Sequence, residues 1–243
     1  MKLKVKTKLK LLKRDFLLSF KRKKENKFDY IFSLGYNCEV AFKFYRFFKF
    51  EESCIFNWVY NVPISDFVKV LNDMDLIGKT GFNKPNPLWE CKTTHLRFHG
   101  KADMSLYINN EATEEMIEQD RNDLIERLAY LKSKFIKFAK SDCKKLYVYK
   151  VFPGDADESK IQDLYSALKN LGAKNFKLLI ITEKAENFKP EDTNDIMYRQ
   201  VDYYAPPDEI TSPKYFNNGF DKIWEEFYCP DNTKHRNKKY KFE

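Results

Sequence analysis

Glycine and proline are scarce in this sequence, and it has no internal repeat. It holds only 7 glycines and 9 prolines, and no period is visible along its 243 residues. Proteins built mainly from loops or from tandem repeats have more of these features, so the chain belongs to neither class. The hydrophobic content of 43% and the aromatic content of 16% are ample for a packed core, which excludes a wholly disordered chain.

Cysteines are few and have no metal-binding spacing. Their number is odd, so they cannot all pair within the chain, and neither a CxxC pair nor a Cys/His cluster is present. We therefore expect free thiols, a reducing cytoplasmic location and no bound metal. The five are Cys38, Cys54, Cys91, Cys143 and Cys229.

Long apolar runs are missing as well, and positive charge is concentrated at the start of the chain. Lysines recur through Lys10 and Lys13, so we expect neither a signal peptide nor a membrane span there. Residues 1–24 hold eleven Lys or Arg and one acid, a net charge of +10, whereas the whole chain carries +8. The remainder is therefore near −2. A nucleic-acid-binding domain carries positive charge on its folded surface, so we expect no nucleic-acid partner.

The basic start is also amphipathic. Leu9, Leu12, Phe16 and Phe20 share one face of a helix, and basic residues lie toward the other. This pattern is typical of a helix that lies on an anionic membrane surface, so residues 1–24 predict a peripheral protein at the inner face of the membrane. The alternative is a helix that is solvated or packed on the domain.

Apolar strand-like segments alternate with helical periodicity along the rest of the chain. We therefore expect an α/β fold with three layers, in which helices cover both faces of a mostly parallel sheet, Rossmann-like or SGNH-like and not a papain fold. The predicted strands are 30–34, 145–152, 177–182 and 197–203. The predicted helices are 40–48, 64–74, 111–140, 161–171 and 220–227. The expected parts are a basic segment with its linker at 1–27, a single α/β domain at 28–230 and a basic tail at 231–243.

A cysteine lies at the first predicted junction between strand and helix. Gly35 allows a sharp turn there, and Asn37 is a good helix cap, which puts Cys38 in the first helical turn. Unpaired amides and the helix dipole favour an anion at that position, and such cysteines have pKa values lowered from about 8.5 toward roughly 3.5–7.5. The amides of Cys38 and Glu39 would then hold an oxyanion. The alternative is a small apolar side chain packed where the strand meets the helix.

Two histidines, His95 and His99, follow in the segment 88–100, which we expect to be extended, so that they share a side. If these two histidines bound a metal ion, no third ligand would stand at a recognisable spacing in the sequence. A better chemical role for one of them is as the partner of Cys38: it would hold the thiolate as an ion pair and later protonate the leaving group. Either histidine is a candidate for this role, and either is compatible with a purely structural one.

Acids follow several of the predicted strands. Ligands bind at the carboxyl ends of the strands in such sheets, so these acids are expected in one crevice with Cys38. Asp155 is the residue that we expect to orient the histidine. The others are Asp157, Glu183 and Asp202.

The segment SLGYNCEVAFKF, followed by FNW and by a histidine some forty residues on, resembles a bacterial family described as papain-like cysteine peptidases, a domain of unknown function. The likeness extends from about Tyr30 to Trp224. Its specific positions are Ser33, Leu34, Gly35, Cys38, Ala41 and Trp58. His99 aligns with the second block, so the resemblance favours His99 as the partner of Cys38, and we keep His95 in reserve. The chain departs from the family's pattern at Asn57 and Gly100, where the family usually has acids. The Gly-Asn-Cys core, interrupted by Tyr36, is also similar to that of capsule-biosynthesis acetyltransferases thought to use coenzyme A.

These features together predict an acyl-transfer enzyme with a thiol nucleophile. The resemblances imply that it acts on glycan or other surface-polysaccharide precursors, with acetyl-CoA or another acyl-CoA as a donor and no other cofactor. Asn57 and Trp58 are expected near the substrate, although Trp58 also suits core packing. One alternative is a cysteine peptidase, and another is a glycan- or sugar-nucleotide-binding protein without turnover, in which Cys38 is structural.

Overall fold

The computed structural model describes residues 26–48, 53–57, 59–60, 63–206, 209–216, 218–227 and 229. The predicted helix within 1–24, Trp58 and the tail 231–243 lie outside the described residues. The strands are β1 (Tyr30–Ser33), β2 (Val59–Tyr60), β3 (Trp89–Glu90), β4 (Arg97–Phe98), β5 (Lys145–Lys150), β6 (Phe176–Glu183) and β7 (Ile196–Val201). The helices are α2 (Glu39–Phe48), α3 (Ile64–Asn72), α4 (Met104–Ile108), α5 (Glu114–Lys140), α6 (Glu158–Asn170) and α7 (Phe220–Trp224).

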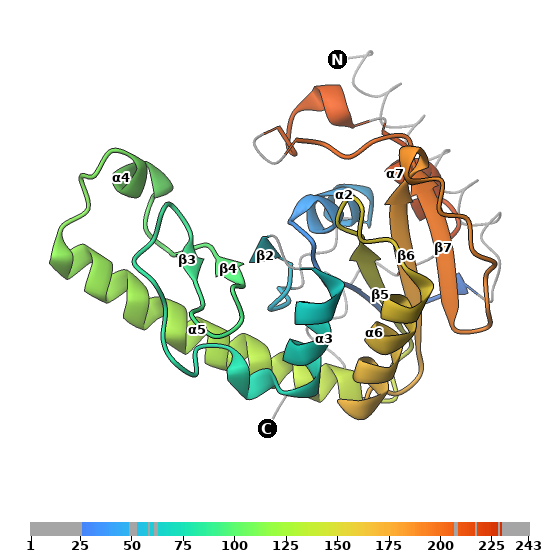
Figure 1. Cartoon of the computed structure of the whole chain (residues 1–243), viewed down its shortest axis with the longest axis horizontal. Coiled ribbons are helices and arrows are strands. Elements are labelled where there is room, and N and C mark those ends of the chain that lie inside the picture. Colours follow the sequence, from blue (N-terminus) through green and yellow to red (C-terminus); the bar gives the residue numbers. More distant parts are fainter. Residues whose placement is uncertain are drawn as a thin grey trace, which may run out of the picture.

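The main sheet has four parallel strands in the order β1-β5-β6-β7 (Figure 1). Its central strands are nearly continuous runs of buried side chains, as expected for a sheet that is covered on both faces. The register places Ile31 opposite Leu146, and Val148 opposite Leu179. The strands lie in chain order, so the described sheet has no reversal of strand order of the kind that forms the ligand crevice of doubly wound folds.

Aromatic side chains fix the helical layer on one face of this sheet. Tyr30 and Phe32 of β1 contact Phe138 of α5, and Tyr149 of β5 contacts Phe67 of α3. Helix α6 packs beside α3 on the same face. Because successive side chains of a strand point to opposite faces, the remaining residues of β1 and β5 face α2 and α7. The fold is therefore the predicted α/β arrangement of three layers.

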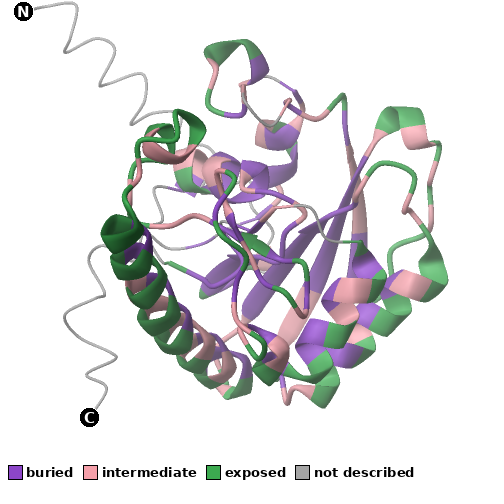
Figure 2. Cartoon of the chain, turned by 60° about the vertical axis from the view of Figure 1, so that its left-hand side comes forward, coloured by how far each residue is buried: buried purple, intermediate pink, exposed green. Residues whose placement is uncertain are grey.

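A small antiparallel sheet in the order β2-β4-β3 lies beside the main one. Helix α5 extends from α4 and this small sheet to the region below α3 and α6 (Figure 1). Its exposed residues lie along the outer side of the helix and its buried residues along the inner side, as its periodicity predicts (Figure 2). One long helix thus joins the small sheet to the main sheet.

All nine predicted strands and helices are present within a few residues, but the segment 88–100 differs from expectation. It is not extended throughout, because Cys91–Leu96 forms a turn in which His95 has φ 56°. The small sheet and α4 were not predicted. Among the described residues, no helix combines the length and apolarity needed to cross a membrane.

Candidate functional site

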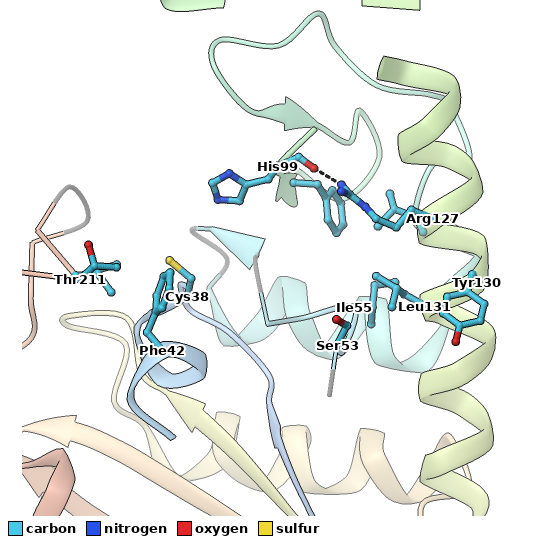
Figure 3. A pocket seen from close by; sticks show the side chains of 12 residues that line it. Cys38, Phe42, Ser53, Ile55, His99, Arg127, Tyr130, Leu131 and Thr211 are labelled. Carbon is cyan, nitrogen blue, oxygen red and sulfur yellow. Dashed lines mark hydrogen bonds between the residues drawn. The ribbon is translucent and has the colours of Figure 1, made fainter. Parts of the chain in front are cut away.

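A cavity of about 710 Å³ opens between the N-terminal end of α2, the small sheet, α5 and the segment 209–216. Cys38 and His99 both line it, and Figure 3 shows the sulfur and the imidazole ring facing the same part of the cavity. The other lining residues are Phe42, Ser53, Ile55, Phe98, Arg127, Leu128, Tyr130, Leu131, Ile210 and Thr211. The structure therefore brings together the two residues selected from the sequence for acyl transfer.

Cys38 is placed by the turn between β1 and α2. Gly35 has φ 108°, in the left-handed region that favours glycine. The carbonyl of Cys38 accepts the first helical hydrogen bond from the amide of Phe42 at 3.0 Å, so Cys38 is itself the N-cap residue and not part of the first turn. Asn37 lies one residue before the N-cap, and its Oδ1 accepts a hydrogen bond from the amide of Glu39 at 3.0 Å. That amide is thus occupied, which corrects its assignment to an oxyanion site.

Burial sets the protonation state of Cys38. The side chain packs with Phe42 against a cluster of Ala205, Ile210 and Tyr215. Burial raises the pKa of the thiol to about 11, although its own backbone and the charge of Lys150 act in the opposite direction. The expectation of a lowered thiol pKa is therefore wrong for this structure, and Cys38 is a neutral thiol at pH 7.

The backbone around His99 is held by α5. Asp120 accepts hydrogen bonds from the amides of Lys101 and Ala102 at 2.6 and 2.9 Å, and Arg127 donates one through Nη2 to the carbonyl of His99. Gly100 lies directly against Asp120, where a Cβ atom would overlap the carboxylate. A glycine at this position therefore lets an acid from α5 fix the turn after His99.

Asp120 also joins the small sheet and α4 to this turn. Its Oδ2 accepts hydrogen bonds from Trp89 Nε1 at 2.7 Å and from the Tyr107 hydroxyl at 2.6 Å. Burial raises the pKa of Asp120, but the hydrogen bonds from Tyr107, Trp89 and the backbone outweigh it and keep that pKa below its usual value. The carboxylate is therefore ionised at neutral pH and holds the segment that carries His99.

His99 is also neutral. Burial and the charge of Arg127 both lower its pKa from the ordinary value of 6.5. No hydrogen bond joins its ring to Cys38 among the described residues. A proton moved from a thiol with a pKa of about 11 to this ring costs roughly 6 kcal/mol or more. The resting site thus holds a neutral thiol and a neutral imidazole, and the predicted ion pair is wrong.

A buried ion pair lies below Cys38. Glu39 and Lys150 have fully buried side chains, with 2.7 Å between Oε2 and Nζ. Glu39 Oε1 accepts hydrogen bonds from Asn218 Nδ2 at 2.9 Å and from the amide of Ala205 at 3.1 Å. Lys43, one turn along α2, lies 3.9 Å from the same carboxylate. Glu39 therefore anchors residues near the segment 209–216, which closes one side of the cavity.

The remaining predicted site residues lie elsewhere. His95 is exposed and contacts Glu90 at 3.2 Å, outside the cavity. Asp155 accepts a hydrogen bond from the amide of Ile64 at 2.9 Å, at the start of α3, and pairs with Lys160. It therefore does not orient His99.

Asn57 is buried but does not line the cavity. Asp157 caps α6, Glu183 accepts a hydrogen bond from the amide of Tyr204, and Asp202 pairs with Lys184. Of the residues expected to converge in one crevice, only Cys38 lines the cavity. No described group of three or more His, Cys, Asp or Glu residues is arranged to hold a metal ion.

Comparisons with protein-family models, with curated proteins and with solved structures found no match to this chain. The resemblance drawn from the motif around Cys38 thus stays a prediction.

Proposed function

We propose that this chain is an acyl-transfer enzyme in which Cys38 is the nucleophile and His99 the general base. The observation that carries the proposal is that two residues from separate parts of the chain, one before α2 and one after β4, line the same cavity. A neutral imidazole is the form that accepts a proton, so the low pKa of His99 suits a base more than a preformed ion pair.

The reaction takes place in two steps. The sulfur of Cys38 attacks the carbonyl carbon of an ester or thioester while His99 takes the thiol proton, and the departing alcohol or thiol leaves with that proton. An acceptor hydroxyl then loses its proton to His99 and attacks the acyl-cysteine, which restores the thiol. The amide of Cys38, at the N-terminal end of α2, supports the proposal as a donor to the oxyanion.

The cost of moving the proton is compatible with turnover. A rate of about 10 per second corresponds to a total barrier of about 16 kcal/mol, which is well above the lower bound of roughly 6 kcal/mol for formation of the thiolate and imidazolium. We infer from the sequence resemblances alone that the acyl donor is an acyl-CoA, that the acceptor is a sugar hydroxyl of a surface-polysaccharide precursor, and that the work takes place in the cytoplasm at the inner face of the membrane.

A second candidate is a binding protein for an acyl or glycan ligand without turnover. The observation in its favour is the pKa of about 11 for the Cys38 thiol, which packs against the cluster containing Ile210. In that case Cys38 is a structural residue in the wall of the cavity.

The test is acylation of Cys38 by p-nitrophenyl acetate and by acetyl-CoA, followed by peptide mass spectrometry. We expect an acetyl group on Cys38, a rate that falls by roughly 10²- to 10⁴-fold in His99→Gln, and no change in His95→Gln, the matched exposed histidine. Cys38→Ala should abolish the adduct. Equal rates in the two histidine variants would exclude His99 as the base, and no adduct with either donor would favour the binding protein.

A further inference from the structure

Arg127 differs from every other arginine that the structure describes. Four of the five have a carboxylate partner: Arg46 with Asp221, Arg97 with Glu90, Arg121 with Glu118, and Arg199 with Asp192 and Glu226. Arg127 has none within ion-pair distance among the described residues, and its one hydrogen bond there joins Nη2 to the carbonyl of His99. Thus none of the described residues that line the cavity carries a negative charge to balance Arg127.

The apolar surroundings of Arg127 indicate what kind of ligand would pair with its charge. Arg127 is half-buried, and much of the cavity wall is apolar: Phe42, Ile55, Phe98, Leu128, Leu131 and Ile210. A charge that is partly removed from water is unfavourable unless it is paired. The guanidinium group presents its donors in a planar fork that fits a carboxylate or a phosphate. Figure 3 shows the side chain of Arg127 reaching from α5 toward His99.

We propose that the cavity binds amphipathic acyl compounds that carry a carboxylate or phosphate, and that Arg127 binds this anionic group while the apolar wall takes the hydrocarbon part. The volume of about 710 Å³ is within the range of roughly 300–1,000 Å³ that is typical of small-molecule sites. The identification of the ligand as an acyl donor rests on the proposed function, whereas its anionic and apolar character rests on the cavity alone.

Binding of an anion here has a consequence for His99. The charge of Arg127 is one of the two causes that lower the pKa of His99, and burial is the other. An anion on Arg127 offsets that charge, so His99 becomes a stronger base when such a ligand is bound. The ligand therefore favours proton transfer from Cys38, in addition to being held in place.

The experiment is calorimetric titration of the full chain with octanoate, octyl phosphate and octanol. We expect both anions to bind at least tenfold more tightly than octanol. Arg127→Gln should weaken binding of the anions by roughly 10- to 150-fold and leave octanol unaffected. Arg121→Gln, which removes the same charge from the exposed face of α5, is the matched control and should leave both affinities unchanged.

Two outcomes overturn the inference: octanol binding as tightly as octanoate to the unaltered chain, or equal anion affinities in Arg127→Gln and Arg121→Gln. The first comparison needs no variant, so it remains decisive if Arg127→Gln fails to fold. Preference for octanoate or for octyl phosphate identifies the anionic group, and either preference supports the inference.

Binding and acylation, measured separately on the unaltered chain, distinguish this inference from the proposed function. Anion binding through Arg127 without any acylation of Cys38 would refute the enzyme and leave the ligand site standing. Acylation that is equally fast with neutral and anionic donors, together with no preference for anions in binding, would refute the ligand site and leave the enzyme standing.

Discussion

Replacement of Glu39 by glutamine tests the central electrostatic feature of the fold. The two side chains have nearly the same size, but the glutamine has no charge. Lys150, whose side chain has 0% exposure, then loses its counter-charge, and Lys43 loses part of its own. Hydrogen bonds from Asn218 and from the amide of Ala205 also lose an ionised acceptor.

The expected loss is large because a charge stays behind in the interior. Removal of one partner from a buried ion pair costs about 3–5 kcal/mol. For a chain of this size each kcal/mol lowers Tm by about 2–4 °C, so Glu39→Gln should lower Tm by roughly 6–20 °C. Burial already lowers the pKa of Lys150, so loss of its proton in the variant reduces the cost toward the lower end.

Urea unfolding followed by circular dichroism at pH 7 measures this loss. Glu118→Gln is the matched control, because Glu118 pairs with Arg121 on the exposed face of α5, and its loss should be under about 1 kcal/mol. The double variant Glu39→Gln/Lys150→Met removes both charges and should be more stable than Glu39→Gln alone.

Two results would refute the reasoning. One is a loss of less than about 1 kcal/mol for Glu39→Gln, which would mean that Lys150 reaches water or another acceptor at little cost. The other is a double variant that is less stable than the single one, which would mean that packing of the lysine stem outweighs its uncompensated charge.

Three further changes follow from the site. At pH 8, iodoacetamide should alkylate Cys38 about 100-fold more slowly in the folded chain than in the urea-unfolded chain, because the raised pKa of about 11 leaves less thiolate. An alkylation rate of the folded chain that stops rising with pH below pH 9 would contradict this. Gly100→Ala places a methyl group against Asp120, so it should lower the free energy of unfolding in urea by roughly 1–3 kcal/mol and slow acylation. An unchanged urea midpoint would show that the turn accommodates the methyl group at no cost. Asp155→Ala should cost roughly 0.5–2 kcal/mol, because it removes the acceptor for Ile64, and leave acylation unchanged; a 100-fold slower rate would place Asp155 back in the site.

The main sheet and its helices could be predicted because their patterns are long. Strands such as β5 and β6 are six and eight residues of mostly apolar sequence, and α5 repeats its apolar side chains at helical spacing over 27 residues. Strands β2, β3 and β4 have two residues each, too few to show an alternating pattern. Their position depends on contacts made by other elements, such as the bond from Trp89 to Asp120.

Two members of the candidate site could be predicted from the sequence, but its other residues and its electrostatics could not. The motif around Cys38 and the position of His99 predicted a cysteine and a histidine, and both line the cavity. The pKa of the thiol depends on burial, to which Ile210 contributes from a distant segment that the sequence alone does not place beside it. Arg127 was missed because Asp123, one turn before it, is a natural helical partner in the sequence, but pairs with Lys101 instead.

Because helix α5 is rigid and contacts the segments that carry Cys38 and His99, it fixes the distance between the thiol and the imidazole. Near its C-terminal end Phe135 and Phe138 pack on Phe32 of the strand that leads to Cys38, whereas Asp120 in its N-terminal part and Arg127 at its middle form hydrogen bonds with the turn that bears His99. The helix thus connects Cys38 and His99, the proposed nucleophile and base. A kink between Arg127 and Phe135 would move the two side chains apart while leaving the parallel sheet intact, so aromatic packing outside the cavity helps to set the spacing that the proposed chemistry needs.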